Sequence, residues 1–226
     1  MADAVEGAVD HLFRRSAGQM VAMLTRSLGP ARLDVAEEAV QDALVRALEV
    51  WPFRGVPDDP QAWLFRVARN RAFDVLRRSA SYERKLDQLA QGEPAAVGIP
   101  AHDDELAMVF MCCHPALSRE VQVTLTLKTV GGFAVQEIAA AFLAEPKAIA
   151  QRLVRAKRTL ADADAQFALP AGPQLAQRTA SVLDVLYLMF NEGYAAHSGD
   201  QLVRHDLCGE AIRLARLVCD DAATAL

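Results

Sequence analysis

The segment Gly131–Leu160 constrains this chain most, because it predicts two helices joined by a tight corner. Two consecutive glycines open the segment and interrupt whatever precedes them. A short apolar helix follows over residues 136–143, and a two-residue corner comes after it. Pro146 suits the first turn of the second helix, where its missing N–H would have no partner. The pattern predicts a helix-turn-helix.

The second helix of this segment has an apolar face and a cationic face, by a repeat of about 3.6 residues. The residues on one face are apolar: Ile149, Leu153, Ala156 and Leu160. The residues on the other face are long cations and an amide: Lys147, Gln151, Arg155 and Arg158, with Arg152 on the flank. Such a helix can enter a major groove, where Arg and Gln pair with base edges. We therefore favour DNA contact over the more common solvated basic helix.

Composition and charge agree with an all-α chain that binds DNA weakly when alone. The 226 residues are 52% hydrophobic but only 6% aromatic, and they are rich in helix-forming Ala, Leu and Arg. Residues 1–60 carry ten acids against six bases, whereas residues 61–80 carry five arginines and one acid. The net charge of −5 implies low affinity for DNA and dependence on a partner.

A second basic helix is predicted over residues 61–79, after a proline-rich loop at 52–60. Its polar face is formed by residues three and four apart: Arg66, Asn70, Asp74 and Arg77. Trp63 also falls on this side. A tryptophan among arginines can stack on an unpaired base, or it can pack beneath the proline loop, since Trp is usually mostly buried. The sequence leaves both options open.

The remaining elements are also predicted to be helical. Helices are expected at 4–28, from Asp34 to about Trp51, at 106–113, at 118–128, from 174 to a cap at Gly193, and at 201–218. The segment 118–128 alternates like a strand, but it has no predicted partner strand, so we expect a helix. Residues 182–190 are apolar nearly all round, as in a buried helix. The helix beginning at Asp34 has an acidic face that is either solvated or a docking surface.

Several classes of protein are not favoured by the sequence. No apolar run reaches the roughly 20 residues of a membrane span, and no signal-peptide core is present, so we expect a cytoplasmic protein with reduced thiols. Cys112 and Cys113 adjoin His114, but adjacent cysteines are poor zinc ligands, and we expect no metal and no cofactor. No nucleophile–base pair or phosphate loop indicates an enzyme.

Three segments together resemble a known family. AEEAVQDALVRALEVW (36–51), AWLFRVARNRAFDVLRR (62–78) and VQEIAAAFLAEPKAIAQRLVRAKRTL (135–160) are similar to bacterial RNA polymerase sigma factors of the extracytoplasmic-function type, group IV of the sigma-70 family. Later stretches, including LDVLYLMFNEGYAA, resemble a subgroup with a tetratricopeptide-like C-terminal extension. The resemblance implies sigma region 2 at 1–82, a linker at 83–104, sigma region 4 at 105–165 and a helical extension at 166–226.

The resemblance also implies roles for particular residues. Those expected to bind core polymerase, at the β′ clamp helices, are Glu38, Gln41 and Asp42, while region 4 would meet the flap region. Those expected to bind the minus-ten element are Arg54, Trp63, Arg66, Asn70, Arg71, Asp74 and Arg77. Those expected at the minus-thirty-five element are Lys147, Gln151, Arg152, Arg155 and Arg158. Separately from the resemblance, the surplus apolar surface of 182–190 motivates the hypothesis that the extension restrains the factor by packing against its promoter-binding domains.

The sequence departs from the family at the corner, where Leu143 replaces the usual Gly and Glu145 the usual Ser. These changes affect the identity of the base-reading residues rather than the fold. Two other functions remain as alternatives. The first is a stand-alone helix-turn-helix regulator, which would bind DNA tightly without polymerase. The second is a non-catalytic helical interaction module, in which the basic helices bind an acidic protein.

Overall fold

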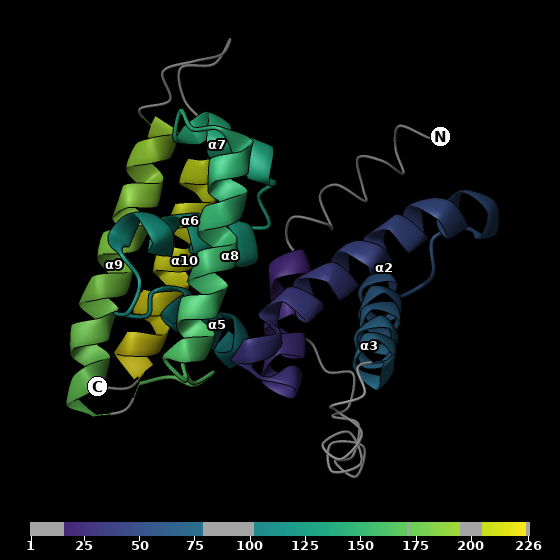
Figure 1. The fold of residues 1–226 in the computed structure, drawn as a ribbon, viewed down its shortest axis with the longest axis horizontal. Coiled ribbons are helices and arrows are strands. Elements are labelled where there is room, and N and C mark those ends of the chain that lie inside the picture. Colours follow the sequence, from purple (N-terminus) through teal and green to yellow (C-terminus); the bar gives the residue numbers. More distant parts are fainter. Residues whose placement is uncertain (1–15, 79–101, 171, 195–204, 225–226) are drawn as a thin grey trace.

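The computed structural model describes residues 16–78, 102–170, 172–194 and 205–224. Every regular element in these ranges is a helix (Figure 1), which confirms the predicted all-α class. Helices form two bodies, one from the N-terminal third of the chain and one from the rest. Among the described residues, no helix combines the length and the apolar character that crossing a membrane requires.

The first body contains the N-terminal helix, described over residues 16–28, the short 3₁₀ helix η1 (Pro30–Arg32), α2 (Leu33–Arg54) and α3 (Pro60–Arg78). α2 and α3 pack along each other. Their buried sides contain many small residues, which allow close approach of two helices: Ala36, Ala39, Ala43 and Ala47 on α2, and Ala68 and Ala72 on α3.

The loop between α2 and α3 is shorter than predicted. α2 continues through Pro52 to Arg54, so the expectation of a loop from residue 52 was wrong. Gly55 ends the helix with a φ of 81°, and its N–H donates to the Trp51 carbonyl at 2.9 Å. A positive φ is readily adopted by glycine, and it is this residue, not the proline, that breaks the helix.

The second body begins with α5 (His102–Cys112), α6 (Arg119–Thr129), α7 (Val135–Ala141) and α8 (Pro146–Asp162). Residues 118–128, which were ambiguous, are helical as predicted. The predicted start of the preceding helix at residue 106 was too late, because α5 begins at His102; Asp104 and Glu105 therefore lie in its first turn and are 4% and 5% exposed. Acids are stabilised at a helix N-terminus. The rest of the predicted linker, 83–101, lies outside the described residues.

The last two helices, α9 (Pro173–Tyr194) and α10 (His205–Thr224), pack against each other and against α5 and α6. They lie on the side of this body that faces away from α2 and α3 (Figure 1). Gly193 is inside α9, so it does not cap the helix as predicted. The prediction of all-round burial was also wrong, since α9 buries one stripe while Tyr187 is 65% exposed.

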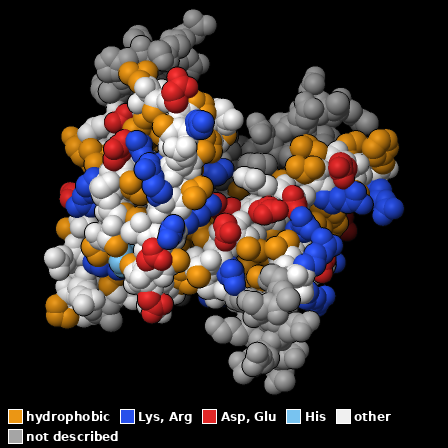
Figure 2. Space-filling view, in the orientation of Figure 1, with side chains coloured by type: hydrophobic (Ala, Val, Ile, Leu, Met, Phe, Trp, Pro, Cys, Tyr) orange, Lys and Arg blue, Asp and Glu red, His pale blue; other side chains and the backbone are white. Residues whose placement is uncertain are grey.

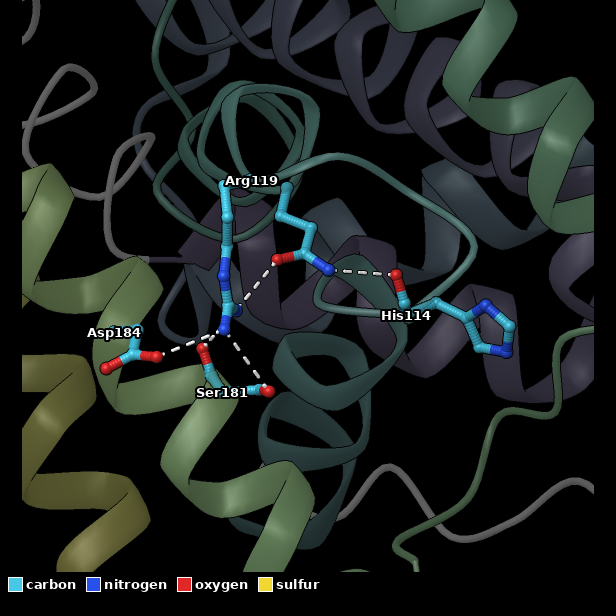
Figure 3. Close-up of polar contacts among 5 residues, drawn as sticks. His114, Arg119, Ser181 and Asp184 are labelled. Atoms are coloured by element: carbon cyan, nitrogen blue, oxygen red, sulfur yellow. Dashed lines mark hydrogen bonds and ion pairs between the residues drawn. The ribbon is translucent and has the colours of Figure 1, made fainter.

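Arg119 fastens α9 to the first turn of α6 (Figure 3). Its Nη1 donates to the Ser181 carbonyl at 2.8 Å, and its Nη2 lies 3.0 Å from the Asp184 carboxylate. Gln122 accepts from the same guanidinium at 3.1 Å and donates to the His114 carbonyl at 2.9 Å. The extension is therefore joined to the helix-turn-helix part of the chain by polar contacts as well as by apolar packing.

Candidate nucleic-acid and polymerase interface

The corner between α7 and α8 has the backbone expected of a tight helix-turn-helix. Leu143 adopts a φ of 48°, the left-handed region that glycine favours. Its side chain is 73% exposed. The Ala144 N–H donates to the Ala139 carbonyl at 2.9 Å, and Ala139 itself is buried. The small residue therefore permits the close packing that the sequence predicted.

Helix α8 separates its two faces as predicted. Its first residue is Pro146, and its buried residues are the four apolar ones expected: Ile149, Leu153, Ala156 and Leu160. On the outer side Lys147, Gln151 and Arg155 are exposed, and none of them forms a hydrogen bond or ion pair with another described residue. Their role in binding DNA stays a prediction, but the structure leaves this face open.

The two other predicted DNA contacts on α8 are placed differently. Arg152 turns toward α6, where its Nη2 lies 2.5 Å from a Glu120 carboxylate oxygen, and only 20% of its side chain is exposed. Arg158 is 83% exposed and lies 3.8 Å from Asp162 on the next turn. In this structure Arg152 ties α8 to α6, whereas Arg158 is available to a phosphate.

Sequence reasoning missed an apolar member of the outer face. Val154 is 67% exposed. Together with Ala150 it forms a shallow apolar depression between Lys147, Gln151 and Arg155. Apolar side chains in a major groove contact the 5-methyl group of thymine. Helical periodicity could have revealed Val154, because it follows Gln151 by three residues and Ala150 by four.

On α3 the predicted contacts divide into two groups. Arg66 and Asn70 are exposed, and Arg77 lies 3.6 Å from Asp74 at the helix surface. Arg71 instead turns toward α2. Its Nε donates to the Asp42 carboxylate at 2.5 Å, and its Nη2 lies 3.9 Å from Glu38.

Arg71 therefore meets two residues that were predicted to bind polymerase. The hydrogen bond and the charge of Asp42 raise the pKa of the Arg71 guanidinium above its usual value. The structure brings a predicted DNA contact and two predicted polymerase contacts into one ion-pair cluster. This pairing orients the acidic face of α2 relative to α3.

Trp63 packs on Trp51 at the end of α2, with ring centroids 5.5 Å apart and planes at 61°. This edge-to-face geometry is favourable for aromatic pairs. Trp51 is 3% exposed, whereas Trp63 is half-buried. Trp63 thus packs on α2 rather than beneath the proline loop, and its stacking on an unpaired base stays a prediction. Arg54, predicted to lie in a loop, is an exposed residue of the last turn of α2.

The outer side of α2 is amphipathic rather than only acidic. Glu38 and Gln41 are exposed, and the same side continues through Val45 and Leu48, which are 55% and 46% exposed. Val45 was missed, although it follows Gln41 by four residues, and Leu48 was expected on the apolar stripe of this helix rather than on its outer side. A docking surface that combines charge at one end with apolar area at the other is typical of protein interfaces.

Glu37, one residue before the predicted docking residues, is buried between the two bodies. It is 8% exposed and accepts a hydrogen bond from the Thr129 hydroxyl at 2.9 Å. Its other carboxylate oxygen pairs with the Lys157 ammonium of α8. Sequence reasoning missed this cluster. The available signal was that Glu37 interrupts the buried stripe of α2 between Leu33 and Val40.

The cysteines offer no metal site in the described part of the chain, where no three His, Cys, Asp or Glu side chains gather for an ion. Cys112 and Cys113 are buried as free thiols. Burial raises the pKa of both thiols, that of Cys113 to about 12, so both are protonated at neutral pH.

Comparison with known proteins is informative for both ends of the chain. Residues 12–82 match the family described as Sigma-70 region 2, which supports a sigma factor of the sigma-70 family. Residues 178–225 match a family of unknown function (DUF6596). An uncharacterized protein of Rhizobium meliloti (strain 1021) is 43% identical over 195 residues, covering 82% of this chain and 46% of that protein. The chain thus spans a little under half the length of this relative. No solved structure matches the chain significantly.

Proposed function

We propose that this protein is a sigma factor that binds core RNA polymerase and directs promoter recognition, DNA melting and transcription initiation. The observation that carries the proposal is the match of residues 12–82 to Sigma-70 region 2. Within that range lie α2 and α3, and several of the predicted residues are exposed on them: Glu38, Gln41, Arg66, Asn70 and Arg77. A helix-turn-helix follows at α7 and α8, which supports the extracytoplasmic-function type.

Core polymerase would dock on the outer side of α2. Glu38 and Gln41 provide the polar end of this surface, while Val45 and Leu48 add apolar area. Asp42 is the third predicted contact, and its pairing with Arg71 fixes its orientation before docking. The partner surface in this proposal is the β′ clamp helices, with the flap region meeting the helix-turn-helix part.

Promoter DNA would meet both basic helices. The exposed Arg66, Asn70 and Arg77 of α3 would hold the melted minus-ten element, where hydrogen bonds must repay the few kcal/mol lost for each unstacked base step. The open face of α8, with Lys147, Gln151 and Arg155, would read the minus-thirty-five element. We propose no catalytic role and no cofactor, and we place the activity in the cytoplasm with the polymerase.

Charge reversal on α2 tests this proposal. Glu38→Arg changes a side chain that is 63% exposed and only loosely paired, at 3.9 Å, so the fold should be retained. We expect purified core polymerase to bind the wild-type chain and to bind this variant at least roughly tenfold more weakly, because truncation or reversal of a central interface charge costs a few kcal/mol. Asp58→Arg, which reverses an exposed acid in the loop between α2 and α3, is the control.

Transcription from candidate promoters completes the test. If core polymerase binds neither variant nor wild type, and the chain shifts duplex DNA by itself, the proposal is wrong and the protein is a stand-alone helix-turn-helix regulator. If neither polymerase nor DNA binds, the interaction-module alternative gains support. Equal binding by wild type and Glu38→Arg would show that polymerase docks elsewhere.

A further inference from the structure

We infer that the free chain is held in a closed form by a latch of Glu37, Thr129 and Lys157, and that polymerase docking on α2 requires this latch to open. The inference rests on the proposed function, because it concerns the same face of α2. It adds a partner for that face in the free protein, namely α6 and α8 of the chain's own helix-turn-helix part.

The latch joins residues that are far apart in the sequence. Glu37 on α2 meets Thr129, 92 positions later at the end of α6, and Lys157, 120 positions later on α8. The side chains of Glu37 and Lys157 are only 10% and 23% exposed. Burying a carboxylate costs free energy unless a cation and hydrogen bonds compensate for the lost water. Here both come from the other body of the molecule, so the closed form satisfies Glu37 while separation would return it to water.

A glycine allows the two bodies to approach this closely. Gly18 lies in the N-terminal helix, directly against Val130 at the end of α6. A Cβ built on Gly18 would lie 2.1 Å from the Val130 carbonyl oxygen, far inside any real contact. The neighbouring atom is backbone, so it cannot swing away. The contact therefore requires glycine at this position, although helix propensity alone would favour alanine.

A second polar cluster joins the same two bodies and includes the extension. Arg26 lies 3.1 Å from Asp104 of α5, and Gln19 donates to Glu105 at 3.4 Å. Glu105 also pairs with Arg213 of α10 at 2.5 Å. Helix α10 thus orients the acid that the N-terminal helix contacts. The extension can in this way favour the closed form through Glu105.

The closed form occupies part of the proposed docking face. A cavity of about 410 Å³ lies between α2 and the end of α6, and Gln41, Val45 and Leu48 line it together with Lys128 and Glu137. Figure 2 shows acidic and basic side chains gathered where the two bodies meet. A clamp helix that docks on Gln41 and Leu48 would therefore compete with the segment from α6 to α7.

Promoter geometry also requires separation. The two promoter elements are named by positions about 25 base pairs apart, which corresponds to roughly 85 Å of duplex at about 3.4 Å per base pair. The proposed minus-ten helix and the proposed reading helix belong to bodies that are in direct contact here. The bodies must therefore part before both elements are bound on one straight duplex.

Two variants open the latch by different means. Lys157→Met leaves Glu37 buried without its cation, which destabilises the closed form relative to the open form. Gly18→Ala inserts a methyl group against the Val130 backbone and changes no charge. The matched controls are Arg216→Met, an exposed cation of α10, and Gly209→Ala, a helical glycine whose added Cβ would meet nothing within 4 Å.

The full-length variants are measured in two ways: radius of gyration by small-angle X-ray scattering, and affinity for purified core polymerase. We expect both opening variants to become more extended and to bind core roughly five- to tenfold more tightly. Only the open fraction of the protein can bind core, so a larger open fraction raises the apparent affinity. The controls should match wild type. Thermal melts identify a variant that fails to fold, and the other variant then decides.

Each outcome has one meaning. Variants that remain as compact as wild type, or that open without gaining affinity for core, would overturn the latch. If the variants open but neither they nor wild type bind core at all, the proposed function fails instead. The wild type therefore distinguishes the two: it binds core if only the latch is wrong, and it does not bind core if the proposed function is wrong.

Discussion

Helices α3 and α8 are both rich in arginine, but Arg71 of α3 and the outer residues of α8 differ in what they contact. On α8 the outer residues Lys147, Gln151 and Arg155 have no described partner, and the apolar residues are buried beneath them. On α3 the central Arg71 is bound to acids of α2. A basic helix in a sequence can thus be a presented surface or part of a scaffold, and net charge does not distinguish the two.

The difference follows from what each helix faces. α3 packs against α2, which carries Glu38 and Asp42 on the adjoining side, so an arginine at the edge finds an acid within reach. α8 packs through Ile149 and Leu153, and its outer face is directed to solvent. Substitutions should therefore separate stability from binding at the open residues of α8, such as Arg155, and combine the two at Arg71 of α3.

The largest effect is expected from Arg155→Ala. We expect binding of the holoenzyme to promoter DNA to fall about tenfold or more, since one two-pronged base contact is worth ~1–3 kcal/mol, while the melting temperature stays unchanged. Competition binding and thermal melts provide the two measurements. Arg152→Ala is the companion variant: its tie to Glu120 predicts a lower melting temperature and a smaller loss of DNA binding. The reverse ranking would mean that Arg152 leaves Glu120 to read the promoter.

Arg71→Ala should affect several properties at once. Loss of its bond to Asp42 should lower the melting temperature and weaken core binding, because the acidic face of α2 loses its orientation. Arg66→Ala, which removes an exposed cation of the same helix, should weaken only promoter melting. Melts and core-binding assays of the two variants test the contrast. Identical behaviour would show that the ion-pair cluster has no structural role.

Val154→Ala tests the apolar part of the α8 face. Removing two methyl-sized groups should weaken promoter binding by up to about tenfold, at ~0.8 kcal/mol per buried group, with little change in stability because Val154 is 67% exposed. The effect should vanish on DNA in which deoxyuridine replaces the contacted thymine. A loss of equal size on both DNAs would exclude a methyl contact.

Leu143→Gly should produce the smallest change, and it should be stabilising. The free energy of unfolding should rise by roughly 0.5–1 kcal/mol, the difference between ~1–2 kcal/mol of left-handed strain and the ~0.5–1 kcal/mol entropic cost of glycine. Chemical denaturation measures it. Leu143→Ala keeps the strain and should show no gain, so equal gains in both variants would contradict the strain argument.

Local patterns predicted the elements well. The proline start and apolar spacing of α8 were correct, and the uncertain segment at α6 proved helical because it had no strand to pair with. The errors concerned helix ends that were predicted from a single proline or glycine. Pro52 did not end α2, which continues to Arg54 and ends at Gly55, and Gly193 lies inside the last turn of α9 rather than after it.

Site residues were predictable only where they project to solvent. The outer face of α8 follows from periodicity, whereas the direction of Arg71 or Arg152 depends on which acid another helix places nearby. The Glu37–Lys157 pair spans 120 positions. A single sequence reveals only that a charged residue stands on a buried stripe, not what satisfies it.

The contact at Gly18 also has a genetic consequence. Any other residue at that position adds a Cβ against the Val130 backbone, so all single-codon changes there act in the same direction. A selection for increased promoter activity should return many different alleles of this one codon. Gain-of-function mutations are usually rare and specific, but here they would be frequent and chemically indiscriminate.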